Sequence, residues 1–142
     1  MNDKLKKQAF GLMIGLLVQY LLGIVVNLFV SFPEDVHGEE LWKFTEKQPL
    51  ILIHILLALL LLIGSSAFVS TSIKQKNSLW IKVSLVAFLS ILLSVITGAL
   101  FVPSQNDTYS VIMASGFAVA AASYGWGLFK SNQKSSKIAR KN

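Results

Sequence analysis

His54 has the side chain with the widest chemistry in this sequence, and it lies inside a long apolar run, Leu50–Ile63. An imidazole titrates near neutral pH, hydrogen bonds through both ring nitrogens, and ligates transition metals and haem iron. Ionisable residues inside membrane segments are rare, and they face a partner, a cavity or a cofactor. His54 is therefore the leading candidate site residue.

Uncharged polar residues are expected at the same depth as His54 if neighbouring helices run antiparallel. They are Asn27, Thr97 with Ser94, and Ser110. We expect them to form an outer-leaflet polar layer that binds a small ligand or a partner. In the alternative, His54 is neutral and bonds Asn27 or a backbone carbonyl, so that the layer serves helix packing alone.

A stripe of small and amide residues repeats every four positions along the first apolar run: Gly11, Gly15, Gln19, Gly23 and Asn27. Small residues at this spacing let helix backbones approach closely, within one chain or in a homo-oligomer. Similar stripes follow later in the chain: Ser90, Ser94 and Gly98, and Ala114, Ala118 and Ala122. The amides must find partners in hydrocarbon, so Gln19 either bonds another helix or contacts the ligand.

His54 could also be an axial ligand of haem b, because helical bundles hold haem between their helices. A bis-histidine site needs a second imidazole. The only other histidine is His37, in a connection between apolar runs. Either His37 folds over the mouth of the bundle, or a dimer pairs two copies of His54. Haem therefore stays open as a cofactor.

The first connection carries a second group of metal-ligating residues: Glu34, Asp35, His37, Glu39 and Glu40. Such a cluster can take a divalent ion, although acidic loops are more often simply solvated. The chain has no cysteine, which excludes disulfides and thiolate chemistry. It also has no Ser–His–Asp arrangement, phosphate-binding loop or zinc-protease motif, and this favours a non-enzymatic protein.

Four apolar runs of about 20 residues predict an all-α, polytopic membrane protein, because only a helix satisfies a lone spanning backbone in lipid. We expect an antiparallel four-helix bundle over residues 1–130, followed by a basic, disordered tail, 131–142. A short interfacial helix is expected at Glu39–Lys47. The expected spans are residues 9–30, 50–72, 83–102 and 109–129.

Basic residues are divided unevenly between the connections. Only Lys43 and Lys47 lie in the first connection, and the third has none, whereas the other eleven flank the opposite ends of the spans. The positive-inside rule therefore predicts cytoplasmic N- and C-termini in a plasma membrane. The net charge of +6 indicates attraction to anionic lipid headgroups at the cytoplasmic face rather than nucleic-acid binding.

The chain resembles a group of uncharacterised small bacterial four-span integral membrane proteins that have no established activity. The resemblance rests on Gln19-x-x-Leu22-Gly23-x-x-x-Asn27-Leu28-Phe29, on Pro33, on His54, and on Asp107-x-x-Ser110-x-x-Met113-Ala114-x-Gly116-Phe117-Ala118. It covers most of the membrane region and excludes the tail. It implies the architecture, draws attention to Asn27, His54 and Asp107, and implies no mechanism.

Three functions fit these observations. The first is a non-enzymatic membrane protein that binds a small ligand or partner through the polar layer around His54. The second is a haem-binding redox or haem-handling protein that uses His54. The third is a small oligomeric transporter or channel subunit, for which the glycine stripe offers a dimer face.

Overall fold

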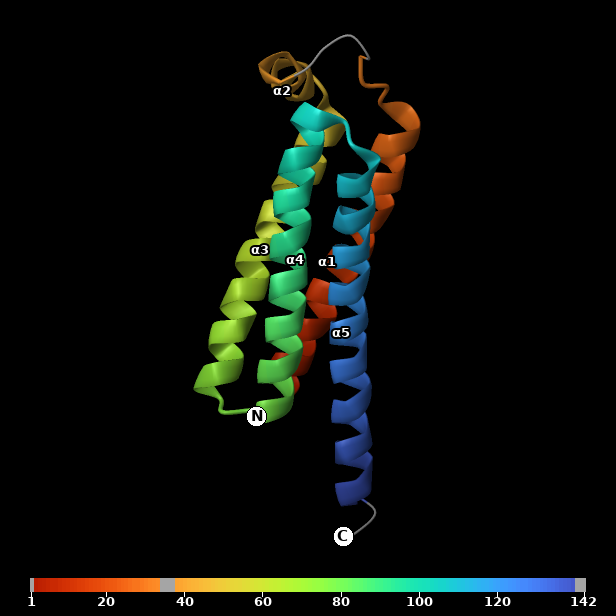
Figure 1. Cartoon of the computed structure of the whole chain (residues 1–142). Helices are drawn as coiled ribbons and strands as arrows, with labels where there is room; N and C mark the ends of the chain where they lie inside the picture. Colours follow the sequence, from red (N-terminus) through yellow and green to blue (C-terminus); the bar gives the residue numbers. More distant parts are fainter. Residues whose placement is uncertain (1, 34–37, 140–142) are drawn as a thin grey trace.

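The computed structural model describes residues 2–33 and 38–139, which form five α-helices (Figure 1). Their bounds are α1 Asn2–Phe29, α2 Glu39–Glu46, α3 Pro49–Lys74, α4 Ser78–Ser104 and α5 Asp107–Ala139. The prediction of helix in the four apolar runs is confirmed, except at Val30, which follows the end of α1. The short helix expected in the first connection is α2.

Four helices, α1, α3, α4 and α5, each contain a segment of 26 or 27 residues that is long and apolar enough to cross a membrane. At 1.5 Å per residue such a segment measures about 40 Å, against about 30 Å for the hydrocarbon core. Large apolar side chains cover the exterior, and Leu28, Phe29 and Ile63 are 71%, 75% and 66% exposed. A soluble protein rarely exposes so much continuous apolar surface. The structure is therefore compatible with a small multi-pass membrane protein.

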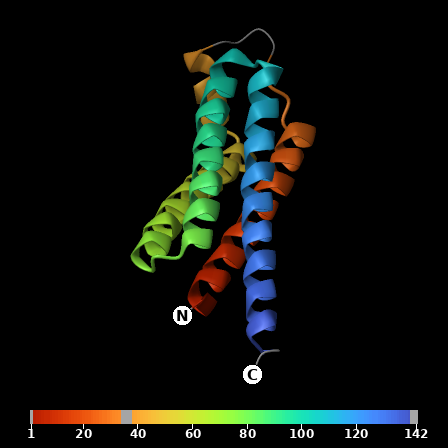
Figure 2. The same ribbon diagram turned by 60° about the horizontal axis from the view of Figure 1, so that its bottom comes forward.

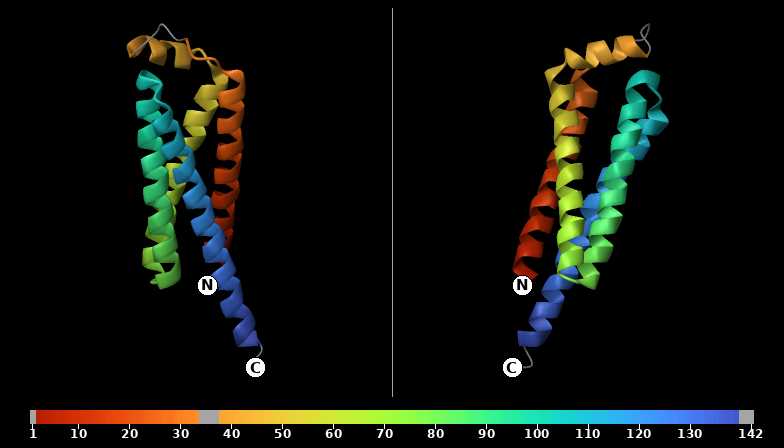
Figure 3. Two further views of the ribbon diagram at one scale, coloured as in Figure 1. Left: turned by 45° about the vertical axis from the view of Figure 1, so that its right-hand side comes forward. Right: turned by 90° about the vertical axis from the view of Figure 1, so that its left-hand side faces the viewer.

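The long helices pack in neighbouring pairs. α1 contacts α3 and α5, and α4 contacts the same two helices. The short helix α2 lies across one end of the long helices, in contact with α3 and α4 (Figure 3). Both chain termini lie at the opposite end (Figure 1). These two ends are called the α2 end and the termini end below.

Hydrogen-bonded turns join α3 to α4 and α4 to α5. Asn77 caps α4, because its Oδ1 accepts the Trp80 backbone N–H at 3.3 Å. Gln105 closes α4 in the left-handed conformation, with φ 50°, and its N–H donates to the Phe101 carbonyl at 2.8 Å. Because these turns are so short, they hold the ends of consecutive helices close together.

An aromatic cluster fills the core toward the termini end. The rings of Phe68 and Trp80 lie 5.7 Å apart, and those of Phe68 and Tyr124 lie 5.6 Å apart, both edge to face. All three residues are buried. The Tyr124 hydroxyl lies 2.9 Å from Ser65 Oγ, which satisfies both polar groups. A Cβ at Gly127 would lie 2.8 Å from Trp80, so this glycine lets α5 approach the indole. The cluster thereby joins α3, α4 and α5.

The helix α5 is longer than the sequence suggested. It continues to Ala139, so that residues 131–139, which were expected to be disordered, are helical and extend beyond the other helices (Figure 2). No glycine or proline follows Gly127 to end the helix. Lys6 Nζ also donates to Asn132 Oδ1 at 2.9 Å, which links the extension to α1.

Candidate functional site

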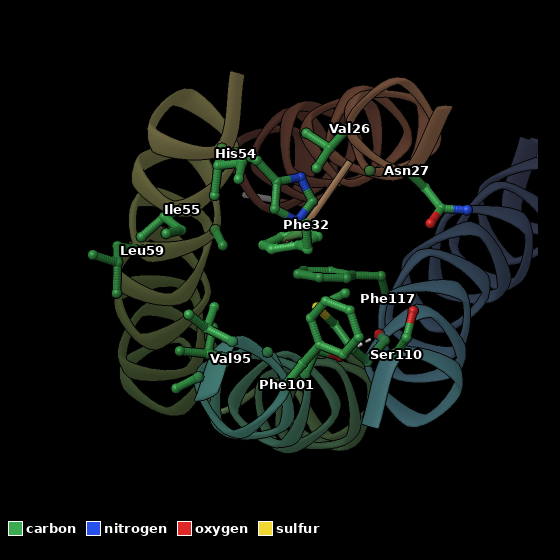
Figure 4. Close-up of a pocket in the computed structure, with 18 of the residues that line it drawn as sticks. Val26, Asn27, Phe32, His54, Ile55, Leu59, Val95, Phe101, Ser110 and Phe117 are labelled. Atoms are coloured by element: carbon green, nitrogen blue, oxygen red, sulfur yellow. Dashed lines mark hydrogen bonds between the residues drawn. The ribbon is translucent and has the colours of Figure 1, made fainter. Parts of the chain in front are cut away.

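A cavity of about 260 Å³ lies between the four long helices toward the α2 end (Figure 4). Apolar side chains form most of its wall, among them Ile55, Val95 and Phe117. The described polar residues in the wall, apart from Trp42 of α2, are Asn27, His54, Ser94 and Ser110. A largely apolar cavity with a few polar groups is the usual composition of a small-molecule site.

Gln19 of α1 is the hydrogen-bond partner of His54 in α3. Its Nε2 lies 3.0 Å from the His54 carbonyl oxygen and 3.2 Å from each ring nitrogen. The amide therefore donates one N–H to the carbonyl and the other to the ring nitrogen that carries no proton. This contact needs one ring nitrogen without a proton as its acceptor.

The same amide has an unused acceptor. Gln19 is fully buried, and its Oε1 has no hydrogen-bond partner in the described part of the chain. A buried carbonyl oxygen without a donor costs about 1–3 kcal/mol. The Gln19–His54 pair is therefore polar and inside the bundle, and the Gln19 Oε1 atom is still free to accept a hydrogen bond.

We expect a double-mutant cycle on this pair to give a coupling free energy of about 0.6–1.7 kcal/mol. Gln19→Leu and His54→Leu are made singly and together, and the free energy of unfolding is measured in mild detergent. The double variant should lose less stability than the sum of the single losses, because the contact can be lost only once. Strictly additive losses would show that the contact contributes nothing.

Asn27 is not the partner of His54, in contrast to one expectation from the sequence. In the described residues no hydrogen bond joins the two, and Figure 4 shows Asn27 on the same side of the cavity as Ser110, away from His54. His54 faces the Gln19–Gly23 turn of α1 instead, since a Cβ at Gly23 would lie 3.2 Å from His54 Cε1 and Gln19 bonds the His54 carbonyl. Asn27 is eight residues beyond Gln19 along α1, about 12 Å at 1.5 Å per residue.

The remaining residues of the predicted layer differ in their roles. Ser94 lines the cavity, but its hydroxyl is within 2.9 Å of the Met113 carbonyl oxygen, which links α4 to α5. Thr97 donates to the Leu93 carbonyl of its own helix at 2.9 Å, and it is not part of the cavity wall. Ser110 lines the cavity from α5. The cavity thus brings together Asn27, His54, Ser94 and Ser110 and leaves Thr97 out.

Aromatic side chains close the cavity at the α2 end. The ring of Phe32 lies 5.8 Å from that of Phe101 in α4, edge to face, and 5.8 Å from that of Phe44 in α2. Leu41 of α2 is fully buried and anchors this short helix over the bundle. Trp42 of α2 also lines the cavity. Only the amphipathic pattern of α2 indicated this aromatic contact in the sequence.

Three of the predicted packing glycines face neighbouring helices. A Cβ at Gly15 would lie 2.8 Å from Leu61 Cδ2, and one at Gly23 would lie 3.2 Å from His54 Cε1. A Cβ at Gly98 would lie 2.9 Å from Met113 Sδ. Gly11 differs, because nothing lies within 4 Å of a Cβ there. The structure therefore uses the stripe of α1 only from Gly15 onward.

The packing face of α5 is not the predicted alanine stripe. Ala118 and Ala122 are exposed, whereas Gly116, Ala120 and Tyr124 are buried. A Cβ at Gly116 would clash with Ser94 Oγ and lie 2.8 Å from the Ser90 carbonyl oxygen. This packing face could have been recognised in the sequence. Gly116, Ala120 and Tyr124 also repeat every four positions, and the last of them has a large aromatic side chain.

The described residues offer few ligands for a metal ion or for haem iron. Glu34, Asp35 and His37 of the predicted metal cluster lie outside the described residues. Within the described ranges no group of three or more His, Asp or Glu side chains is placed to hold a metal ion. Haem ligation by His54 stays a prediction, and it would require the imidazole to reorganise its contact with Gln19.

No protein-family model, curated protein or solved structure matches this chain.

Proposed function

We propose that this chain is an antiparallel four-helix bundle in a plasma membrane, with both termini in the cytoplasm and α2 outside. In the sequence, eleven of the 13 basic residues belong to the N-terminal stretch, to the α3–α4 connection with the start of α4, and to the C-terminal stretch. The positive-inside rule assigns the termini end to the cytoplasm. The amphipathic helix α2, which lies across the other end, suits a position at the outer membrane interface. In this orientation the cavity lies at the depth of the outer leaflet.

We infer that the cavity binds a mainly apolar small molecule that carries one neutral hydrogen-bonding group. The observation that carries this inference is the composition of the wall, which is apolar except for a few polar side chains. The side chains of Asn27 and Ser110 make no hydrogen bond in the described part of the chain, so both are free to bond a ligand. Their amide and hydroxyl can donate and accept, which suits a hydroxyl or carbonyl group.

The ligand is expected to be uncharged. Among the described residues that line the cavity there is no lysine, arginine, aspartate or glutamate. A charged ligand would therefore lose its hydration without gaining an opposite charge, which costs several kcal/mol in an apolar site. An elongated neutral amphiphile or an aromatic alcohol meets these conditions.

A matched pair of probes tests this proposal. 2-Naphthol and naphthalene share the same ring system, but only 2-naphthol has a hydroxyl. In nanodiscs we expect saturable binding of both, with 2-naphthol bound about 10-fold more tightly, because one hydrogen bond in an apolar site contributes about 1 kcal/mol or slightly more. Binding is measured by the change in Trp42 fluorescence, with Trp42→Phe as the control for signal from the other tryptophans.

The double substitution Asn27→Ala with Ser110→Ala should remove the preference for 2-naphthol and leave naphthalene binding in place. Its thermal unfolding should match that of the native chain, since neither side chain bonds the rest of the described protein. A failure to bind either probe, or a preference that survives the double substitution, would contradict the proposal.

A further inference from the structure

A second concave surface lies on the outside of the molecule, away from the cavity. It is a groove of about 360 Å³ between α4 and α5. Val86, Val119 and Trp126 line it and are 49%, 48% and 52% exposed, so the groove faces the surroundings of the helices rather than the core. Among the described residues of its wall Lys82 is the only charged one, and it is five residues into α4, toward the termini end.

One cation lies in the groove wall at this end, and a second lies beside Trp126, another residue of the wall. Lys82 is exposed and has no ion-pair partner in the described ranges. Lys130 places its Nζ 6.0 Å from the centre of the Trp126 ring, a cation–π distance. The termini end has one acidic residue in the sequence, Asp3, so its positive charge is largely unneutralised. The groove thus joins an apolar wall to a positively charged end with an indole between them.

We propose that this groove binds one anionic phospholipid from the leaflet at the termini end. An acyl chain would lie along Val86, Val119 and Ala122, and the phosphate would lie near Lys82 and Lys130. Cations at the headgroup level attract anionic lipids, and tryptophan prefers the same interfacial depth. A second copy of this chain fits the groove less well, because a twofold contact would bring the lysines of the two copies together.

Lipid retention during purification tests the proposal. The full chain is delipidated in mild detergent, exposed to phosphatidylglycerol or to phosphatidylcholine with the same acyl chains, and examined by native mass spectrometry. We expect about 10-fold tighter binding of phosphatidylglycerol, as a single bound molecule per chain. Glycerol 1-phosphate, the headgroup without acyl chains, should not compete at millimolar concentration. Competition by this compound would show that the apolar wall plays no part.

Two kinds of variant distinguish the contribution of the lysines to lipid binding from that of the apolar wall. Lys82→Gln with Lys130→Gln should reduce the preference for phosphatidylglycerol to less than 2-fold, whereas Lys43→Gln with Lys47→Gln, at the α2 end, should keep it. Val86→Trp fills the apolar wall and should weaken the binding of both lipids, with both lysines intact. Equal binding of the two lipids by the native chain, the same loss in both lysine pairs, or a dimer mass in place of the lipid adduct would overturn the proposal.

Discussion

Replacing Gly23 with leucine is expected to abolish the binding of 2-naphthol and to lower the free energy of unfolding by about 1–3 kcal/mol. Gly23 lines the cavity, and a Cβ at this position would already lie 3.2 Å from His54 Cε1. The rest of a leucine side chain must therefore displace His54 or fill the cavity. Either change removes the space that the probe needs. Probe fluorescence in nanodiscs and unfolding in mild detergent measure the two effects.

Gly11→Leu is the matched control for this substitution. Gly11 lies in the same helix, and nothing lies within 4 Å of a Cβ there. Both variants gain the same atoms and the same helix propensity. Gly11→Leu should bind 2-naphthol like the native chain and lose no stability. If Gly23→Leu also bound the probe with native affinity, the cavity would not be the binding site.

Trp80→Ala is expected to give the largest loss of stability, about 3 kcal/mol. Trp80 is fully buried against Phe68, and the indole also fills the space opposite Gly127. Removing such a side chain from a protein core costs about 3–5 kcal/mol. We expect the lower end of this range, because a separated membrane helix still keeps its side chains in an apolar solvent. The loss should appear as a lower thermal unfolding temperature in detergent.

Trp126→Ala provides the comparison, because it removes the same side chain from a residue that is 52% exposed. This substitution should lower the free energy of unfolding by less than about 0.5 kcal/mol. Equal losses at the two positions would mean that the aromatic cluster of Phe68, Trp80 and Tyr124 does not hold the termini end together.

Much of the fold could be predicted from local properties. The four apolar runs predicted the four long helices, and the short amphipathic segment after Gly38 predicted α2. The prediction failed for the tail, which is helical to Ala139 where polarity suggested disorder. A polar segment is well solvated, but a helix without glycine or proline can still continue into solvent. The hydrogen bond between Lys6 and Asn132 supports the extension here.

The candidate site could be predicted only in part. His54 stood out because it interrupts an apolar run, and it does line the cavity together with Asn27 and Ser110. Its partner Gln19 was expected to bond some neighbour, but the sequence did not identify His54 as that neighbour. Thr97 was assigned to the layer by depth alone, and it bonds its own helix instead.

The sequence by itself determined that this protein has four membrane-length helices, which ends carry the positive charge, and that one histidine lies among apolar residues. Hydropathy, charge and helix propensity belong to each residue wherever its neighbours lie. Only the tertiary structure decided that Gln19 meets His54, that Gly116 rather than the alanine stripe faces α4, and that a cavity remains near the α2 end. Each residue adds 1.5 Å and about 100° along a helix, so small offsets between helices change which side chains meet, and no local pattern specifies those offsets.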